Sequence, residues 1–393
     1  MTPTGPLSGV LVVDLSRALA GPHATMMLAD LGARVIKVES PGRGDDTRGW
    51  GPPFVDPPHG ERESTYFLSA NRNKESICLD LKDGDDLRLL LDLASRADVV
   101  VENFRTGVME RLGLGPGTLS ALNPRLVQLS ISGFGHDGPE GGRAGYDQIA
   151  QGEGGLMSIT GPAPDQPQRM GVPICDLLAG MYGAYGVLAA LHHRATTGRG
   201  QVVRTSLLAA AVGVHAFQGT RWTVGGQVAR ADGNHHGAIA PYGLFRCADG
   251  AVQLSVGSEA LWLRFCAGFD LDATDPVFAT NSDRVVRRDD LVTVVERAFA
   301  SWRAVDLLDR LTELGVPAGR VRSIDEVYEW EQTQSQGLVV DVQHSTLGGL
   351  RLPGPPLRFF SPEGDERTPG EHAAPPALDE HGASIRAWLA APR

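Results

Sequence analysis

The amino-acid sequence predicts an α/β protein: a large domain with a doubly wound, largely parallel, Rossmann-like sheet, and a smaller α+β domain. Three observations predict this fold. The chain of 393 residues is too long for one ordinary core. Continuous apolar runs of strand length alternate with helical patterns over residues 9–132, which implies parallel strands with right-handed crossovers. A second strand pattern then restarts after a loop rich in Gly and His.

The first predicted βαβ unit lies at the start of the chain. Gly9–Leu15 (GVLVVDL) is a continuous apolar run, as expected of a parallel strand that is buried on both faces. Pro22 suits the first position of the following helix, and Gly32 suits its end. The next strand is expected at Ala33–Glu39.

The later elements define the domain organisation. In the large domain we expect a helix at Asp86–Ala97 and strands at Asp98–Phe104 and Arg125–Ser132. In the small domain we expect strands within Tyr242–Gly257 and helices at Asp289–Ala300 and Ala304–Leu314. The predicted ranges are a large domain over 1–220, a small domain over 225–327, and a C-terminal segment over 328–393 that ends in a helix at Ser384–Ala390.

Composition and charge exclude several classes of protein. The apolar content of 42% and charged content of 21% are typical of a globular protein. The net charge of −11 argues against nucleic-acid and anionic-membrane partners, both of which need a basic field. The longest apolar run is Gly-rich and shorter than a bilayer span, and the start (MTPTGPLSG) lacks a signal-peptide pattern. Four cysteines without CxxC spacing indicate free thiols in a reducing cytoplasm: Cys78, Cys175, Cys247 and Cys266.

Two motifs resemble ligand sites but favour other interpretations. Gly133–Gly138 (GFGHDG) has the spacing of a dinucleotide fingerprint, yet Pro139 and two further glycines follow it instead of a helix, so we expect a turn. The pairs His192–His193 and His235–His236 have no third ligand at metal spacing, so we expect no metal site. The missing fingerprint also argues against a nicotinamide enzyme.

One acid, Asp176, stands at the head of an apolar segment that contains no other charged residue before Arg194. Asp is a good N-cap, and it is also a possible reacting group, so both interpretations stay open on the residues alone. Gly180, Gly183 and Gly186 leave a flat helix face for close packing. A buried carboxylate is costly unless it is paired or faces a cavity.

Several motifs in order resemble the class III CoA-transferases of the formyl-CoA and carnitine-CoA transferase type (CaiB/BaiF family), a superfamily that also contains α-methylacyl-CoA racemases. They include LAGPHATMMLADLGARVIKVESPGRGDDTR (Leu19–Arg48), NRNKESICLDL (Asn71–Leu81), ADVVVENFRTGVMERLGLG (Ala97–Gly115), GYDQIAQGEGGLMSITG (Gly145–Gly161) and GNHHGAIAPYGLFRCADG (Gly233–Gly250). The resemblance covers nearly the whole chain. It implies acyl-CoA and a small carboxylic acid as substrates and no permanently bound cofactor.

The same resemblance implies an interlocked homodimer and a C-terminal segment that returns to the large domain. CoA would lie between the large domain of one chain and the small domain of its partner. Asp176 is implied to be the acyl-accepting nucleophile, which would form a mixed anhydride and then an aspartyl-CoA thioester. With a reference pKa of about 3.9, this carboxylate would be ionised at neutral pH and would need no general base.

The resemblance also assigns residues to the ligand. The CoA-contacting positions it implies are Ala20, Gly21, Lys74, Asn103, Phe104 and Arg111. The substrate-pocket positions it implies are Tyr146, Asp147, His235, His236 and Gly237. The sequence departs from the formyl-CoA branch at two places. A covering run of glycines is reduced to Gly233 and Gly237, and a basic residue is replaced by Ala144.

A racemase is the alternative function within the superfamily. Its proton-abstracting His would lie in a GHD-type motif, which here reads Gly145-Tyr146-Asp147. Tyrosine, with a reference pKa near 10, is a poor base at neutral pH, so CoA transfer is favoured. A CoA-binding protein without catalysis is disfavoured because Asp176 is retained. The acyl donor and acceptor stay open, with Arg169 and Arg246 as candidate partners for a distal carboxylate.

Overall fold

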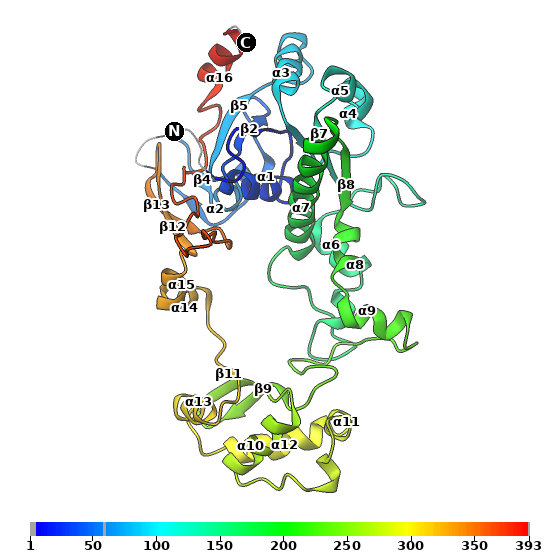
Figure 1. Ribbon diagram of the computed structural model, residues 1–393, viewed down its shortest axis with the longest axis vertical. Helices are drawn as coiled ribbons and strands as arrows, with labels where there is room; N and C mark the ends of the chain where they lie inside the picture. The colour runs from blue at the N-terminus through cyan, green and yellow to red at the C-terminus, as the bar shows by residue number, and fades with distance from the viewer. Residues whose placement is uncertain (1–4, 58–59, 392–393) are drawn as a thin grey trace. The chain divides into compact units, whose positions relative to one another are not determined.

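The computed structural model describes residues 5–57 and 60–391, so the first four residues of the start examined for a signal pattern lie outside the described part. The chain divides into two compact units (Figure 1). The first unit comprises Met1–Leu156, Met170–Gly226 and Glu331–Arg393, and the second comprises Met157–Arg169 and Gln227–Trp330. The sequence-based ranges place Met157–Arg169 in the large domain, whereas the structure groups this segment with the second unit.

A six-stranded parallel sheet forms the centre of the first unit, in the order β5-β2-β1-β6-β7-β8. The strands are β1 (Leu11–Asp14), β2 (Arg34–Glu39), β5 (Lys74–Cys78), β6 (Val99–Glu102), β7 (Val127–Ser132) and β8 (Val202–Ser206). The prediction of a parallel, doubly wound sheet is confirmed. The strand order reverses between β1 and β6, and in such sheets ligands bind beyond the carboxyl ends of the strands at this point.

Helices cover both faces of the sheet. Buried side chains of one face pack against α1 (Ala20–Asp30), α6 (Asp147–Glu153), α7 (Ile174–Thr197) and α8 (Leu207–Gly213). Those of the other face pack against α3 (Gly84–Arg96), α4 (Val108–Arg111), α5 (Pro116–Leu122) and α16 (Gly382–Ala390). The first unit also contains shorter elements: η1 (Asp46–Gly49), β3 (Phe54–Val55), β4 (Glu63–Ser64), α2 (Thr65–Ser69) and α9 (Ala216–Thr223). The short η2 (Met157–Ile159) belongs to the second unit.

The structure corrects one local expectation and confirms another. Helix α1 begins at Ala20 with Leu19 as its N-cap, so Pro22 is the third helical residue and not the first. Proline is tolerated there because the first four N–H groups of a helix have no partner within the helix. Residues Gly133–Gly138 bend after β7 and lead into a turn at Pro139–Gly142, with no helix following the motif, so the predicted turn is confirmed.

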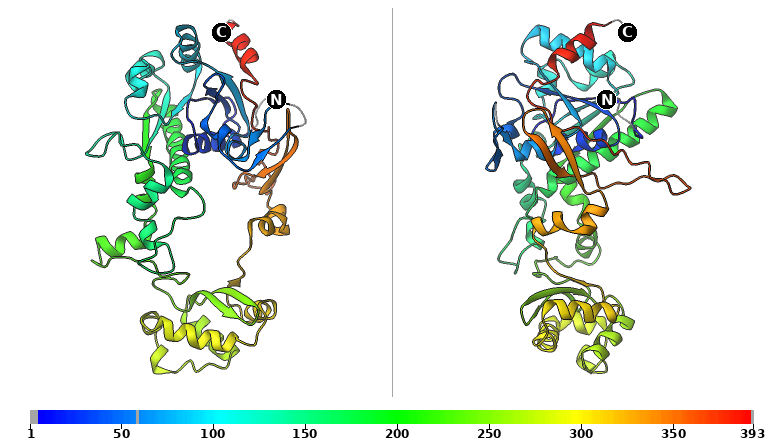
Figure 2. Two further views of the ribbon diagram at one scale, coloured as in Figure 1. Left: turned by 180° about the vertical axis from the view of Figure 1, so that it is seen from behind. Right: turned by 90° about the vertical axis from the view of Figure 1, so that its left-hand side faces the viewer.

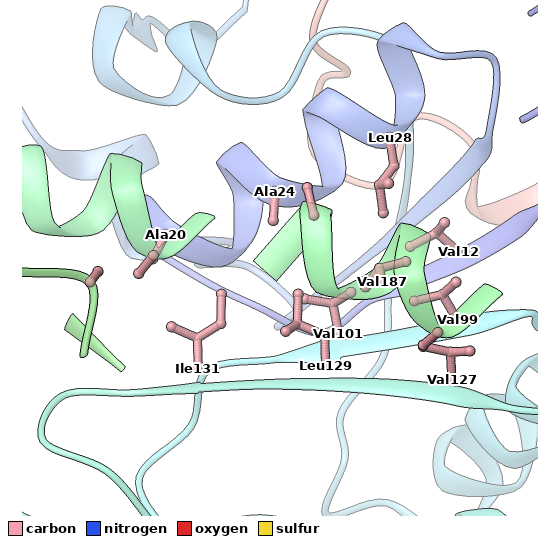
Figure 3. Close-up of a cluster of buried hydrophobic side chains, with 14 of the residues drawn as sticks. Val12, Ala20, Ala24, Leu28, Val99, Val101, Val127, Leu129, Ile131 and Val187 are labelled. Carbon is pink, nitrogen blue, oxygen red and sulfur yellow. The ribbon is translucent and has the colours of Figure 1, made fainter. Parts of the chain in front are cut away.

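The apolar helix α7 packs closely on α1 and the sheet (Figure 3). A Cβ built on Gly180 would lie 2.6 Å from the backbone oxygen of Ala20, and one on Gly183 would lie 2.9 Å from a Leu129 methyl carbon. The expected flat glycine face is thus confirmed. With 24 residues, α7 is long and apolar enough to cross a membrane by length and composition alone, which corrects the shorter estimate from the sequence.

We expect Gly180→Ala to destabilise the chain by about 1–3 kcal/mol, because the new methyl group would collide with the backbone of α1, which would have to shift. The first turn of α1 would be displaced with it. Thermal melts compare this variant with Gly117→Ala in α5, where a Cβ meets nothing within 4 Å. Alanine at position 117 should be neutral or slightly stabilising. Equal stability of the two variants would contradict the proposed close contact.

The second unit contains a three-stranded sheet in the order β11-β10-β9. Its elements are β9 (Tyr242–Cys247), β10 (Gly250–Ser255), α10 (Glu259–Gly268), η3 (Pro276–Phe278), α11 (Asn281–Val286), α12 (Arg288–Phe299), α13 (Ala304–Glu313), β11 (Ala318–Gly319) and α14 (Ile324–Glu329). Strands β9 and β10 form an antiparallel hairpin, and its buried side chains share a separate core with α10, α12 and α13.

The C-terminal segment belongs to the first unit. It contains α15 (Glu331–Ser335), the hairpin of β12 (Val339–His344) and β13 (Gly348–Pro353), and α16. This segment, orange to red in both views of Figure 2, runs alongside the first unit. The backbone N–H of His381 donates to the Ser76 carbonyl of β5 at 3.0 Å, so the segment contacts the edge strand of the sheet.

Candidate active site

A cavity of about 390 Å³ lies in the first unit at the carboxyl ends of β1 and β6. It is the position at which a doubly wound sheet binds its ligand. Of the residues assigned from the sequence, six line this cavity: Ala20, Asn103, Phe104, Tyr146, Asp147 and Asp176. The fold therefore brings together residues that are up to 156 positions apart in the chain.

Asp176 does not cap its helix. Helix α7 begins at Ile174, with Pro173 at the N-cap position, so Asp176 is the third helical residue. The capping carboxylate is Asp147, whose Oδ1 accepts hydrogen bonds from the backbone N–H groups of Cys175 (2.8 Å) and Asp176 (3.4 Å). The other oxygen of Asp147 accepts from the Gln151 amide at 2.6 Å. The capping interpretation is therefore wrong for Asp176, and its carboxylate is left free for another role.

The Asp176 carboxylate accepts no hydrogen bond from any residue in the described part of the chain. Burial, together with the negative charge of Asp147, raises the pKa of Asp176 to about 7. This corrects the expectation that the group is fully ionised at neutral pH. A more basic carboxylate is a stronger nucleophile once ionised. The neighbouring Cys175 thiol is buried and its pKa is raised to about 12, so it is an inert thiol.

Two aromatic residues of the cavity were missed by the sequence analysis. Trp50 and Tyr66 line it, and their rings meet edge to face at a centroid distance of 5.1 Å. Burial and the nearby Asp176 and Asp147 carboxylates raise the pKa of Tyr66 to about 12, so its hydroxyl stays protonated and can donate. Neither residue stands in a pattern that marks a site. Their presence depends on how the segment after β2 folds back onto the cavity.

Three of the implied CoA-contacting residues lie outside the cavity lining. The Lys74 ammonium is fully buried, where it donates to Asp14 at 3.1 Å and to the Pro22 carbonyl at 2.8 Å. The Lys74 side chain therefore has no surface exposed to a ligand, which corrects its implied assignment as a CoA contact. Gly21 is buried, with no room for a Cβ against Ser16. Arg111 ends α4 with an exposed side chain.

His235, His236 and Gly237 lie in the second unit. The His236 ring stacks on Tyr242 of β9 at 4.9 Å, and its backbone N–H donates to the Tyr242 carbonyl at 2.9 Å. The His235 ring packs edge to face on Phe245 at 5.5 Å. Within the second unit these histidines therefore pack on the first strand of the hairpin. In the described residues, no group of three or more His, Cys, Asp or Glu side chains is arranged to hold a metal ion.

Residues 7–382 match the family model of CoA-transferase family III. The chain belongs to CoA-transferase family III. The succinate–glutarate CoA-transferase of Agrobacterium fabrum is 40% identical over 394 residues, covering 98% of this chain and 96% of that protein. The succinyl-CoA:glutarate CoA-transferase of Mus musculus is 39% identical over 378 residues, covering 96% of this chain and 84% of that protein.

A solved structure supports the same family. The crystal structure of a CaiB/BaiF family protein from Brucella suis is 40% identical and has a TM-score of 0.86, covering 98% of this chain and 99% of that chain. The resemblance recognised in the sequence motifs is thus confirmed, and this member of CoA-transferase family III is an enzyme that uses CoA thioesters.

Proposed function

We propose that this CoA-transferase moves CoA from a dicarboxylic acyl-CoA to a free dicarboxylic acid through covalent intermediates on Asp176. The observation that carries the mechanism is the state of the Asp176 carboxylate, which lines the cavity without a hydrogen-bond partner in the described residues. Support for the substrate class comes from relatives that are named succinate–glutarate and succinyl-CoA:glutarate CoA-transferases.

The proposed reaction begins when an Asp176 oxygen attacks the thioester carbonyl carbon. The C–S bond breaks, CoA leaves as a thiolate, and a mixed anhydride forms. The thiolate then attacks the Asp176 carbonyl carbon, which releases the donor acid as a carboxylate and leaves an aspartyl-CoA thioester. We assign the protonated Tyr66 hydroxyl as a donor to the oxyanion that develops in these steps.

The second half reverses these steps with the acceptor. Its carboxylate attacks the aspartyl-CoA thioester, which expels CoA thiolate and forms a second mixed anhydride. The thiolate attacks the acceptor's acyl carbon, so that the new acyl-CoA leaves and the Asp176 carboxylate is regenerated. The acyl group or the CoA stays activated throughout, because anhydrides and thioesters are both high-energy acyl compounds.

The direct test follows CoA exchange between succinyl-CoA and glutarate by liquid chromatography and mass spectrometry. Hydroxylamine added during turnover should convert Asp176 to a hydroxamate that is located by peptide mapping. A panel of other acyl-CoAs and acids defines the substrate class. CoA exchange with no modification at Asp176 would contradict the covalent mechanism.

The raised pKa of Asp176 predicts the pH dependence of the reaction. We expect kcat/KM for the acyl-CoA to rise with pH through an apparent pKa of about 7, because only the ionised carboxylate attacks. Below that value the rate should fall about tenfold per pH unit. Because the acceptor enters only in the second half-reaction, its own titration does not affect kcat/KM for the acyl-CoA. A flat profile over this range would refute the role of the free carboxylate.

Racemisation is disfavoured by the geometry of the corresponding motif. Tyr146 stands where the racemase base is expected and is 69% exposed, and the Asp147 carboxylate is occupied as the cap of α7. Exchange of the acyl α-hydrogen with deuterated solvent, without CoA exchange, would instead favour the racemase.

We also propose that two chains form the interlocked homodimer implied by the resemblance, in the cytoplasm. The support is an uncovered set of large apolar side chains on α7 and α9: Met181, Tyr182, Tyr185, Leu188, Phe217 and Trp222. Tyr185 is 72% exposed, which is unusual for a ring on a core helix. Light scattering tests whether the mass is twice the 41.8 kDa of one chain. The four free thiols support a reducing compartment.

A further inference from the structure

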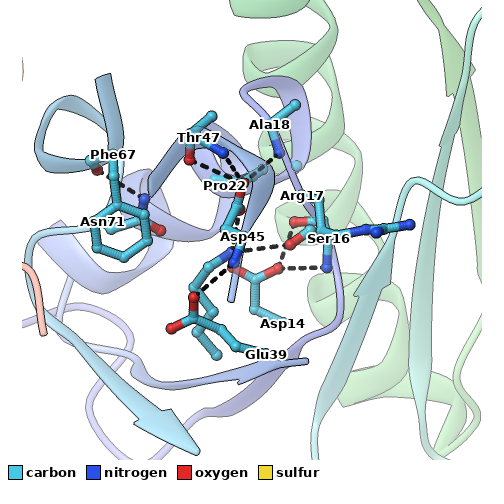
Figure 4. A network of polar contacts seen from close by, with 12 residues as sticks. Asp14, Ser16, Arg17, Ala18, Pro22, Glu39, Asp45, Thr47, Phe67 and Asn71 are labelled. Carbon is cyan, nitrogen blue, oxygen red and sulfur yellow. Dashed lines mark hydrogen bonds and ion pairs between the residues drawn. The ribbon is translucent and has the colours of Figure 1, made fainter. Parts of the chain in front are cut away.

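Arg17 follows β1, next to Ser16 and Ala18 in the polar network of Figure 4, and its backbone is fixed from two sides. The side-chain amide of Asn103 accepts from the Arg17 backbone N–H at 2.8 Å and donates to the Arg17 carbonyl at 2.6 Å. The next residue, Ala18, has a positive φ of 64° and donates its N–H to Asp45 at 3.1 Å. A non-glycine residue in this conformation is typical of functional sites, where the surrounding structure enforces it.

The Asp45 carboxylate that holds this turn is itself held firmly. It forms a fully buried ion pair with Lys37 at 2.8 Å. The Lys37 ammonium also donates to the Ser16 carbonyl at 2.9 Å, one residue before Arg17. Asp45 further accepts from the backbone N–H of Thr47 at 3.0 Å. The backbone at Ser16–Ala18 is therefore anchored to β2 through Lys37 and to the residue after β6, Asn103.

The Arg17 guanidinium, in contrast to its backbone, is largely available to bind a ligand. It lines the cavity, and its side chain is 46% exposed. Its ion pair with Asp46 is long, at 3.8 Å, and Asp46 is itself 60% exposed. The guanidinium also lies 5.3 Å from the centre of the Phe104 ring, which orients it over another cavity residue.

The other candidate arginines are less suited than Arg17 to bind a substrate anion in this cavity. Arg143 lines the same cavity, but it is paired with Glu140 at 3.3 Å and with Glu153 at 2.7 Å. Arg105 also lines it and is exposed, and its carbonyl accepts a hydrogen bond from the nearby Val108 N–H at 3.0 Å instead of from a side chain of another strand. Arg169 and Arg246, the candidates from the sequence, belong to the second unit and do not line this cavity. An available guanidinium on firmly anchored backbone is thus found at Arg17.

We propose that Arg17 is a substrate-binding residue whose guanidinium binds an oxyanion of the substrate remote from the reacting carbonyl. Guanidinium groups bind carboxylates and phosphates through paired hydrogen bonds, and this protein carries a net charge of −11, so an anionic substrate needs such a local cation. The oxyanion is either the distal carboxylate of a dicarboxylic acyl group or a phosphate of CoA. This inference rests on the proposed function.

Binding is measured by titration calorimetry in the Asp176→Ala background, in which no turnover interferes. Three ligands distinguish a distal carboxylate from a CoA phosphate as the oxyanion that Arg17 binds. Succinyl-CoA carries both groups, butyryl-CoA lacks the distal carboxylate, and succinyl-pantetheine lacks the CoA phosphates. Each is titrated into chains with Arg17, Arg17→Met or Arg17→Lys. The matched control is Arg88→Met, which removes one positive charge from the exposed surface of α3.

We expect Arg17→Met to weaken binding about 10- to 100-fold, with partial rescue by lysine and no change for Arg88→Met. If the anion is the distal carboxylate, both succinyl ligands weaken and butyryl-CoA does not. If it is a phosphate, both CoA thioesters weaken and succinyl-pantetheine does not. Unchanged binding of all three ligands, or an equal loss for all three with a lowered melting temperature, would overturn the assignment. Failure of all ligands to bind even with Arg17 present would instead count against the proposed function.

Discussion

Asp176→Asn is expected to reduce CoA exchange by at least about 10⁴-fold, because an amide cannot form the anhydride on which both half-reactions depend. The substitution keeps the size and shape of the side chain. Asp147, which caps the helix, is untouched. The rate of transfer from succinyl-CoA to glutarate measures the effect. The control is Asp309→Asn, which removes an exposed carboxylate from α13 and should retain full activity. Activity within tenfold of the unmodified chain would refute the nucleophile.

The same variant is expected to be more stable than the parent above neutral pH. Because the pKa of Asp176 is raised from 3.8 to about 7, the folded chain holds this proton more tightly than the unfolded chain does. Ionisation therefore costs stability progressively from about pH 4 to pH 7, and by the full amount above pH 7. Because the carboxylate faces a cavity that solvent can enter, its cost is reduced by screening. We therefore expect Asp176→Asn to raise the free energy of unfolding by about 1–3 kcal/mol at pH 8 and not to change it at pH 4. Thermal melts at the two pH values test this. A gain that does not change with pH would contradict it.

Lys37→Met is expected to lower the free energy of unfolding of the first unit by about 3–5 kcal/mol. Lys37 and Asp45 are both fully buried, and the loss of the ammonium leaves the Asp45 carboxylate without its counter-ion. Burial alone would lower the pKa of Lys37, but the carboxylates of Asp45, Asp14 and Glu39 raise it, so the pair is ionised in the fold. Chemical denaturation measures the change.

The control for this prediction is Lys82→Met at an exposed position, which should change stability by less than about 0.5 kcal/mol. The double variant Lys37→Met/Asp45→Asn should recover part of the loss, because it removes the unpaired charge. A loss below about 1 kcal/mol for Lys37→Met would show that the buried pair is not required for the fold.

The parallel sheet could be predicted because its central strands are continuous apolar runs, and β1 and β6 are examples. The strands β5 and β8 could not, because Lys74, Ser76 and Arg204 interrupt the apolar pattern. Lys74 is tolerated inside the sheet only because it pairs with Asp14, 60 residues earlier. A local pattern cannot reveal such a partner, and for the same reason the sequence could not show that Lys74 is buried in the fold instead of contacting CoA.

For the site, the motifs pointed to the reacting carboxylate but not to its environment. The cap of α7 comes from Asp147, 29 residues before Asp176. The raised pKa of Asp176 depends on burial and on that same carboxylate, both of which arise only in the folded chain. Trp50 and Tyr66 were missed because aromatic residues in a loop look alike whether they pack on a core or line a cavity.

The return of the C-terminal segment to β5 has a consequence for biosynthesis. The Asp379 carboxylate accepts from the Cys78 N–H at 2.6 Å, and Asn73 and Ala373 are joined by hydrogen bonds of 3.0 and 2.7 Å. A ribosome has therefore made the whole second unit before the residues that seal β5 emerge. Until those residues emerge, β5, the edge strand of the sheet, stays exposed. Stalled or shortened products should consequently present this edge to chaperones and to each other.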